Sequence, residues 1–144
     1  RWAPWVQQIL LDSDETVVVG VLDLSGLRDT KNLVDRLRQQ RGATSPVRMV
    51  LNHQGVSKKT ELSPKDFENA MDMKPDVIIP HAPSVFGAAL NNGQMIGEVN
   101  SKHKSAESLR ELALIVSGRQ PQQKAKKSLL GQLGLQSKAK AKAK

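Results

Sequence analysis

Three short runs of mainly apolar residues recur along the chain, at residues 16–22, 47–51 and 77–79. Their sequences are TVVVGVL, VRMVL and VII, and each run ends at a polar or proline-containing turn. Short apolar runs rich in β-branched residues are typical of strands in a sheet covered on both faces, which we expect of residues 16–22 in particular. The segments between the runs have helical spacing. The pattern therefore predicts an α/β fold, with right-handed crossovers, a parallel sheet and helices on both faces.

Five helices are predicted, at residues 2–10, 27–37, 65–71, 83–90 and 105–116, with a long loop at 93–104. Ser63 is expected to cap the third helix, because a hydroxyl followed by proline is a frequent helix start. Ser105 is expected to cap the last helix, and residues 42–46 are expected to form a loop. One core is predicted to contain Val17, Val19, Val50, Ile78, Leu109 and Leu112.

The stretch 76–96, DVIIPHAPSVFGAALNNGQMI, is expected to carry a ligand site. Pro80 ends the third strand because proline cannot donate to a strand ladder, and Pro83 can begin the next helix. In open α/β sheets, ligands bind at the carboxyl ends of the strands. The preceding strand ends at Asn52, and an amide there can both donate and accept hydrogen bonds. The residues alone also allow a simpler interpretation, in which Asn52 only turns the chain and Pro80 only stops a strand.

The net charge of +8 is concentrated at the end of the chain. Residues 119–144 contain Arg119 and seven lysines without an acidic residue, which leaves 14 basic and 14 acidic residues in 1–118. We therefore expect a neutral folded part and a basic flexible tail. The tail has four leucines beside its lysines, so it could lie on an anionic membrane surface or remain in solvent. The chain has no cysteine. It opens on Arg1 and not on methionine, so we expect a fragment or a processed chain.

No catalytic constellation is visible in the sequence. It contains no G-x-x-x-x-G-K-[ST] or G-x-G-x-x-G motif, so no loop that could hold phosphates is predicted. The histidines at 53, 81 and 103 are far apart and lack metal-ligand spacing. Asp23 at a strand end could be a phospho-acceptor, but an aspartate that caps the following helix is the favoured interpretation.

Four segments in order, VRMVLN, SPKDFENAM, IIPHAPSVFGAALNNGQMIGEV and SLRELALIVSG, resemble the carboxyl-terminal half of the MinD/ParA-type ATPases. The segments VLDLSGLRDTKNLVDRLR and KDFENAM are most similar to the CpaE/TadZ proteins of tight-adherence (Flp-type) pilus assembly. The resemblance covers about residues 1–118. No single motif is specific, and the order and spacing of the segments carry the resemblance.

The resemblance implies a P-loop NTPase-like domain whose amino-terminal half is missing here, followed by the tail at 119–144. It implies that Asn52, Pro80, His81 and Ala82 line the adenine side of an ATP site. The P-loop and Mg²⁺ ligands would come from the missing half, so we expect that this chain does not hydrolyse ATP alone.

The expected role is a localisation or scaffold factor for pilus biogenesis. It would form a homodimer and would bind other pilus assembly proteins. Its expected location is the cytoplasm, or the inner face of the cell membrane or the cell pole. We favour an anionic membrane over nucleic acid as the partner of the tail. The alternatives are a non-catalytic scaffold that has lost nucleotide function and a ParA-like DNA partitioning ATPase.

Overall fold

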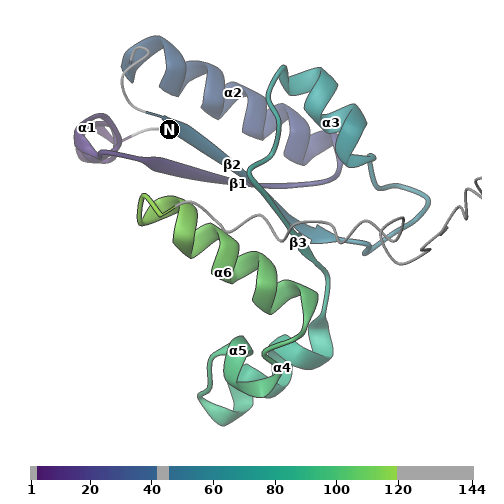
Figure 1. Cartoon of the computed structure of the whole chain (residues 1–144). Helices are drawn as coiled ribbons and strands as arrows, with labels where there is room; N and C mark the ends of the chain where they lie inside the picture. The colour runs from purple at the N-terminus through teal and green to yellow at the C-terminus, as the bar shows by residue number, and fades with distance from the viewer. Residues whose placement is uncertain (1–2, 42–45, 120–144) are drawn as a thin grey trace, which may run out of the picture.

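The computed structural model describes residues 3–41 and 46–119, and its central element is a three-stranded parallel sheet (Figure 1). The strand order is β1-β2-β3, and both strand pairs are parallel. The predicted fold class is therefore confirmed. The predicted loop at 42–46 and tail at 119–144 lie outside the described residues, apart from Pro46 and Arg119. In chain order the elements are α1 (Pro4–Asp12), β1 (Thr16–Val21), α2 (Leu24–Arg41), β2 (Val47–Gln54), α3 (Pro64–Met71), β3 (Val77–Pro80), α4 (Pro83–Asn92), α5 (Ile96–Val99) and α6 (Lys104–Val116).

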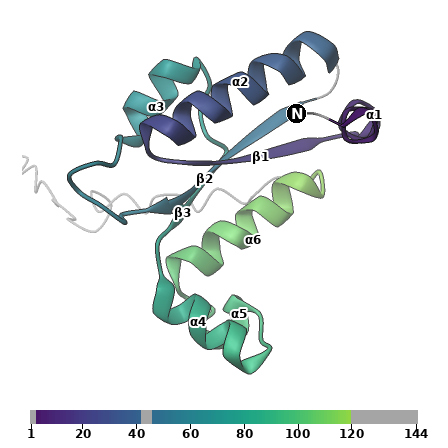
Figure 2. The same cartoon turned by 180° about the vertical axis from the view of Figure 1, so that it is seen from behind.

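Helices cover the two faces of the sheet and create two separate apolar clusters (Figures 1 and 2). Because side chains alternate along a strand, Met49 and Leu51 point to one face while Val50 between them points to the other. The cluster on the α2–α3 face contains Val18, Leu22, Val34, Leu37, Met49, Leu51, Phe67 and Met71. The cluster on the α6 face contains Val50, Val77 and Ile79, packed against Val17, Leu109, Leu112 and Ile115. The predicted core is therefore wrong for two members. Val17, Val50, Leu109 and Leu112 lie together on the α6 face, but Ile78 packs against the other cluster and Val19 is exposed.

The prediction that β1 is covered on both faces is also wrong. Val19 is 59% exposed and Val21 is 43% exposed, although Val18 beside them is buried. Both exposed side chains lie on the face of the sheet that carries α6. Helix α6 packs against β3, at the other edge of the sheet. On this face, no described helix covers β1.

The helix ends follow the predicted chemistry in two cases. The Ser63 hydroxyl accepts a hydrogen bond from the Asp66 N–H at 3.1 Å, so the predicted cap of α3 is confirmed. Helix α4 begins at Pro83 and is followed by Gly93 in a left-handed conformation with φ of 63°. Glycine adopts this conformation without the steric cost that a Cβ brings, which explains why the helix stops there.

The start of α6 differs from the prediction. The cap is His103, whose Nδ1 accepts a hydrogen bond from the Ser105 N–H at 3.1 Å. Ser105 instead lies inside the helix, is fully buried, and donates from its hydroxyl to the Pro80 carbonyl at 3.0 Å. The predicted loop at 93–104 also contains the short helix α5.

Arg41, the last residue of α2, is buried and fixes the position of α1. Its guanidinium donates to the carbonyl oxygens of Leu10 and Ser13, and also to the Ser13 hydroxyl at 2.7 Å and the Thr16 hydroxyl at 2.6 Å. A cation beside the last carbonyls of a helix also interacts favourably with its dipole. No helix within the described ranges combines the length and apolar composition that crossing a membrane requires.

Candidate functional site

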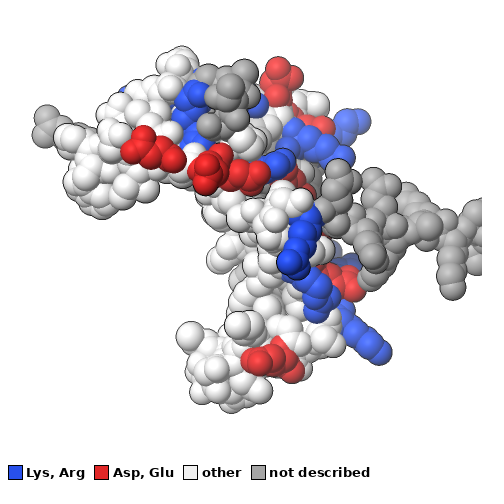
Figure 3. All heavy atoms as spheres, turned by 60° about the vertical axis from the view of Figure 1, so that its left-hand side comes forward, with Lys and Arg blue, Asp and Glu red and all other residues white. Residues whose placement is uncertain are grey.

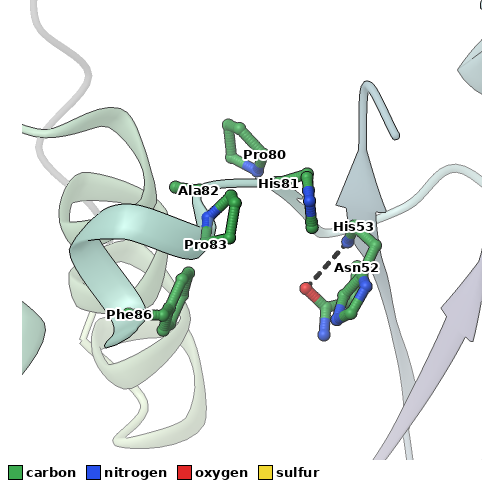
Figure 4. Close-up of a pocket in the computed structure, with 7 residues that line it drawn as sticks. All are labelled: Asn52, His53, Pro80, His81, Ala82, Pro83 and Phe86. Atoms are coloured by element: carbon green, nitrogen blue, oxygen red, sulfur yellow. Dashed lines mark hydrogen bonds between the residues drawn. The ribbon is translucent and has the colours of Figure 1, made fainter. Parts of the chain in front are cut away.

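A pocket of about 410 Å³ lies at the carboxyl ends of β2 and β3. Pockets for small ligands and cofactors usually fall in the range of roughly 300–1,000 Å³. The pocket is lined by Asn52, His53, Pro80, His81, Ala82, Pro83 and Phe86 (Figure 4). The four residues expected at the adenine side come from two segments well apart in the sequence, and they line this one cavity.

The β2 wall of the pocket has an unusual backbone. His53 has a left-handed conformation with φ of 62°, which is uncommon for a residue with a side chain. The Asn52 side-chain oxygen accepts a hydrogen bond from the His53 N–H at 2.8 Å, which stabilises this turn (Figure 4). Among the described residues, Nδ2 of the same amide has no hydrogen-bond partner and can donate to a ligand. Strained backbone of this kind concentrates at functional sites.

The opposite wall is held from two sides. The His81 N–H donates to the Gln54 carbonyl at 2.8 Å, which ties the end of β3 to β2. The Pro80 carbonyl accepts the hydrogen bond from Ser105, which ties the same segment to α6. Ala82 is buried, and its carbonyl accepts from the Phe86 N–H at 3.1 Å as α4 begins. Hydrogen bonds therefore fix this wall to both β2 and α6.

Two histidines lie close together in the pocket lining (Figure 4). The ring centroids of His53 and His81 are 5.5 Å apart, with an interplanar angle of 41°. His53 and His81, although far apart in the sequence, are therefore brought together by the fold, while His103 serves as a helix cap. Within the described ranges, no group of three or more histidine, aspartate or glutamate side chains could hold a metal ion. The lining contains no aspartate, glutamate, lysine or arginine, and several of its residues have flat rings.

The loop after β2 is organised by one carboxylate. Both side-chain oxygens of Glu61 accept a hydrogen bond from the Gly55 N–H at 2.9 Å, and one also accepts from the Ser57 N–H at 3.4 Å. Lys58 and Lys59 are exposed on this loop and do not line the pocket. The pocket itself therefore offers contacts for a flat heterocycle but no lysine or arginine for phosphate groups.

Asp23 is a capping residue, as favoured from the sequence. Its Oδ1 accepts hydrogen bonds from the Gly26 N–H and the Ser25 hydroxyl, each at 2.6 Å. These bonds, the Gly26 N–H first, lower the pKa of the Asp23 carboxyl below its usual value. Ionised Asp23 therefore stabilises the turn between β1 and α2.

Sequence reasoning missed three lining residues, namely His53, Pro83 and Phe86. His53 follows Asn52 directly, and Pro83 and Phe86 lie in the first turn of the helix that follows the third strand. Their adjacency to the strand ends was the available signal. Residues in the first turn of the following helix also face the sheet edge, so they belong to the same set.

The parallel sheet, its helices on both faces and the pocket at its carboxyl edge can be compared with known proteins. No family model matches the sequence, and no curated protein matches it. The solved structures similar to the chain include the septum site-determining protein MinD from Pyrococcus horikoshii, complexed with Mg-ADP. It has 23% identity and a TM-score of 0.64, with 77% of this chain and 44% of that chain covered.

Two further structures share the fold. A ParA family ATPase from Chlorobium tepidum has 20% identity and a TM-score of 0.65, over 78% of this chain and 45% of the other. A chain of the MinC:MinD cell division complex from Aquifex aeolicus has 17% identity and a TM-score of 0.66, over 83% and 49%. This chain therefore spans less than half the length of each of these structures. At these identities the likeness shows the fold alone, which this chain shares with part of these MinD and ParA family structures.

Proposed function

We propose that this chain supplies the adenine side of an ATP site, as a base pocket built from Asn52, Pro80, His81 and Ala82. The observation that carries the proposal is that these residues, expected from the resemblance, line one pocket whose walls are fixed by hydrogen bonds. Proline and imidazole rings offer flat surfaces for a base, and the Asn52 amide can donate to a ring nitrogen. The donor set fits a neutral heterocycle.

The phosphates and Mg²⁺ of ATP require other groups. The lining residues include no carboxylate that could bind Mg²⁺ and no lysine. Phosphoryl transfer depends on a phosphate-binding loop, a lysine and a metal ion, and no stretch of this sequence matches such a loop. We infer that the pocket binds and orients the base, and that this chain alone does not turn over ATP.

The wider role that we propose is that of a CpaE/TadZ-like localisation or scaffold factor for Flp/Tad-type pilus biogenesis. The protein would act as a homodimer that binds other pilus assembly proteins, in the cytoplasm or peripherally at the inner face of the membrane. The segments VLDLSGLRDTKNLVDRLR and KDFENAM support this assignment, and so does the MinD/ParA fold. Cells that produce the Asn52→Ala protein should assemble fewer pili or position the protein wrongly. Normal pili and normal position would contradict the role.

The base pocket is tested by titrating the isotope-labelled full chain with adenosine and with ATP, followed by NMR. Both ligands should shift the amide signals of residues 52–54, 81–82 and 84–86 with similar affinity, because the pocket does not contact phosphate. Loss of one hydrogen bond worth about 1–1.5 kcal/mol predicts that Asn52→Ala weakens binding roughly 5- to 10-fold. Asn69→Ala, at an exposed position on α3, is the matched control and should leave the affinity unchanged.

Two results would overturn the proposal. The first is the absence of shifts at these residues when adenosine is at millimolar concentration. The second is equal binding by the Asn52→Ala and Asn69→Ala chains, which would mean that Asn52 only turns the chain. ATP hydrolysis by the purified chain that is lost on mutation of Lys58 or Lys59 would contradict the inferred lack of turnover.

A further inference from the structure

A second and larger cavity adjoins the base pocket, and Phe86 lines both. It is a groove of about 680 Å³ between α4, α5 and α6. Phe86, Ala89 and Leu90 of α4, Ile96 of α5 and Leu109 of α6 are among its lining residues. Leu90 is 83% exposed and Met95, between α4 and α5, is 76% exposed, so two large apolar side chains stand at the groove in solvent. Exposed apolar surface of this kind marks an interaction site.

The groove is also poor in charge. Residues 83–97, which form α4 and the turn into α5, contain no charged residue. Figure 3 shows mostly uncharged atoms over the lower lobe that α4 and α5 form. Only Glu98 and Arg110 bring charges to the lining, and the Glu98 carboxylate accepts a hydrogen bond from the Met95 N–H at 2.7 Å. An occupant should therefore be apolar and itself uncharged.

We propose that the occupant is a segment of this same chain, residues 128–137, with the sequence SLLGQLGLQS. This segment contains four leucines and no charged residue, and lysines flank it at 126, 127 and 138. Its composition matches the uncharged apolar groove, and the flanking lysines can remain in water. The last described residue, Arg119, lies just beyond the end of α6, so the segment is tethered to the helix that forms one wall of the groove.

The tether is long enough for this contact. The distance along the axis of α6 from Val116 back to Leu109 is about 10 Å at the usual rise of an α-helix. The residues from 120 to 128 can span up to roughly 30 Å when extended. A segment held on so short a tether has an effective concentration on the order of millimolar, so a weak apolar contact suffices to populate the docked state.

Docking is tested by disulfide trapping, because the chain has no cysteine of its own. The full chain carrying Met95→Cys and Gln132→Cys is compared with a chain carrying Leu24→Cys and Gln132→Cys. Leu24 is a matched control because it is a similarly exposed apolar side chain, at 73%, on α2 and outside the groove. Under mild oxidation of dilute protein, the groove pair should form its intramolecular disulfide about tenfold faster than the control pair.

Two further variants of the groove pair separate docking from chance collisions. Replacing Leu129, Leu130 and Leu133 with serine should reduce the crosslinking rate to that of the control. Leu90→Asp should do the same, and it leaves the fold intact because that side chain is largely exposed.

Equal rates for the groove and control pairs would overturn the proposal. If the leucines were then required for binding to anionic vesicles, a membrane would be the partner of the segment instead. Crosslinking that occurs mainly between molecules and increases with protein concentration would also overturn it, because the groove would then hold the segment of a second copy.

Discussion

Two serines of α6 hold the edge strand β3, and removing their hydroxyls should destabilise the fold. Ser105 donates to the Pro80 carbonyl at 3.0 Å, and Ser108 donates to the Ile78 carbonyl at 2.8 Å. The N–H of His81, the residue after Pro80, points to β2, where it donates to Gln54. Successive residues of a strand alternate in direction, so the carbonyls of Ile78 and Pro80 point away from β2. The serines thus satisfy carbonyls that the ladder leaves open.

The expected cost is worked from these two bonds. A carbonyl that loses its donor in a partly buried position costs about 1–2 kcal/mol, so the Ser105→Ala, Ser108→Ala double variant should lose about 2–4 kcal/mol of unfolding free energy. Ser117→Ala is a matched control, since its hydroxyl also donates to a carbonyl, that of Leu114 at 3.0 Å, but at an exposed position. Its cost should be below about 0.5 kcal/mol.

The measurement is urea-induced unfolding of the full chain, followed by far-UV circular dichroism. A double variant as stable as the control would refute the reasoning, because β3 would then not depend on α6 for its edge carbonyls. In that case the base pocket should also be unaffected. If the reasoning holds, the same variant should weaken adenosine binding, since the Pro80 wall loses one of its two supports.

Arg41→Met should cost about 2–4 kcal/mol of unfolding free energy, because the carbonyls at the end of α1 lose their donor. Arg41→Lys should recover only part of this free energy, since lysine cannot reach several acceptors at once. Phe67→Ala should cost about 3–5 kcal/mol of unfolding free energy and Leu112→Ala less, because Phe67 is fully buried and Leu112 only half-buried. Equal losses of unfolding free energy in urea would contradict this order. The pKa of Asp23 is lowered in the folded chain, so its stabilisation relative to Asp23→Asn should be present above the usual carboxyl pKa and disappear as the pH falls through the folded value. A stability difference that does not change with pH would contradict this.

The elements of the fold could be predicted because each depends on local pattern. The three strands and five of the helices follow from apolar runs, helical spacing and caps such as Ser63. The failures depend on tertiary position. The exposure of Val19 depends on where α6 crosses the sheet, and the role of Ser105 depends on a carbonyl 25 residues away. Neither relation leaves a periodic signal in the sequence.

The candidate site could also be predicted only in part. Asn52 and Pro80 could be brought together in advance because carboxyl ends of neighbouring parallel strands meet at one edge of a sheet. The His53–His81 pair could not, because it depends on the left-handed backbone of His53. A left-handed histidine has no sequence signal comparable to that of a glycine.

The base pocket and the apolar groove share one side chain, Phe86, which lines both cavities. It lies in the first turn of α4, whose start forms the pocket wall and whose outer part carries Leu90 at the groove. Any occupant of the groove that moves this ring changes the wall against which a base would pack. By thermodynamic linkage, a base that fixes the ring must change the affinity of the groove for its occupant by the same factor. The α4 helix is therefore the element through which binding of a base and docking of an apolar segment would influence each other.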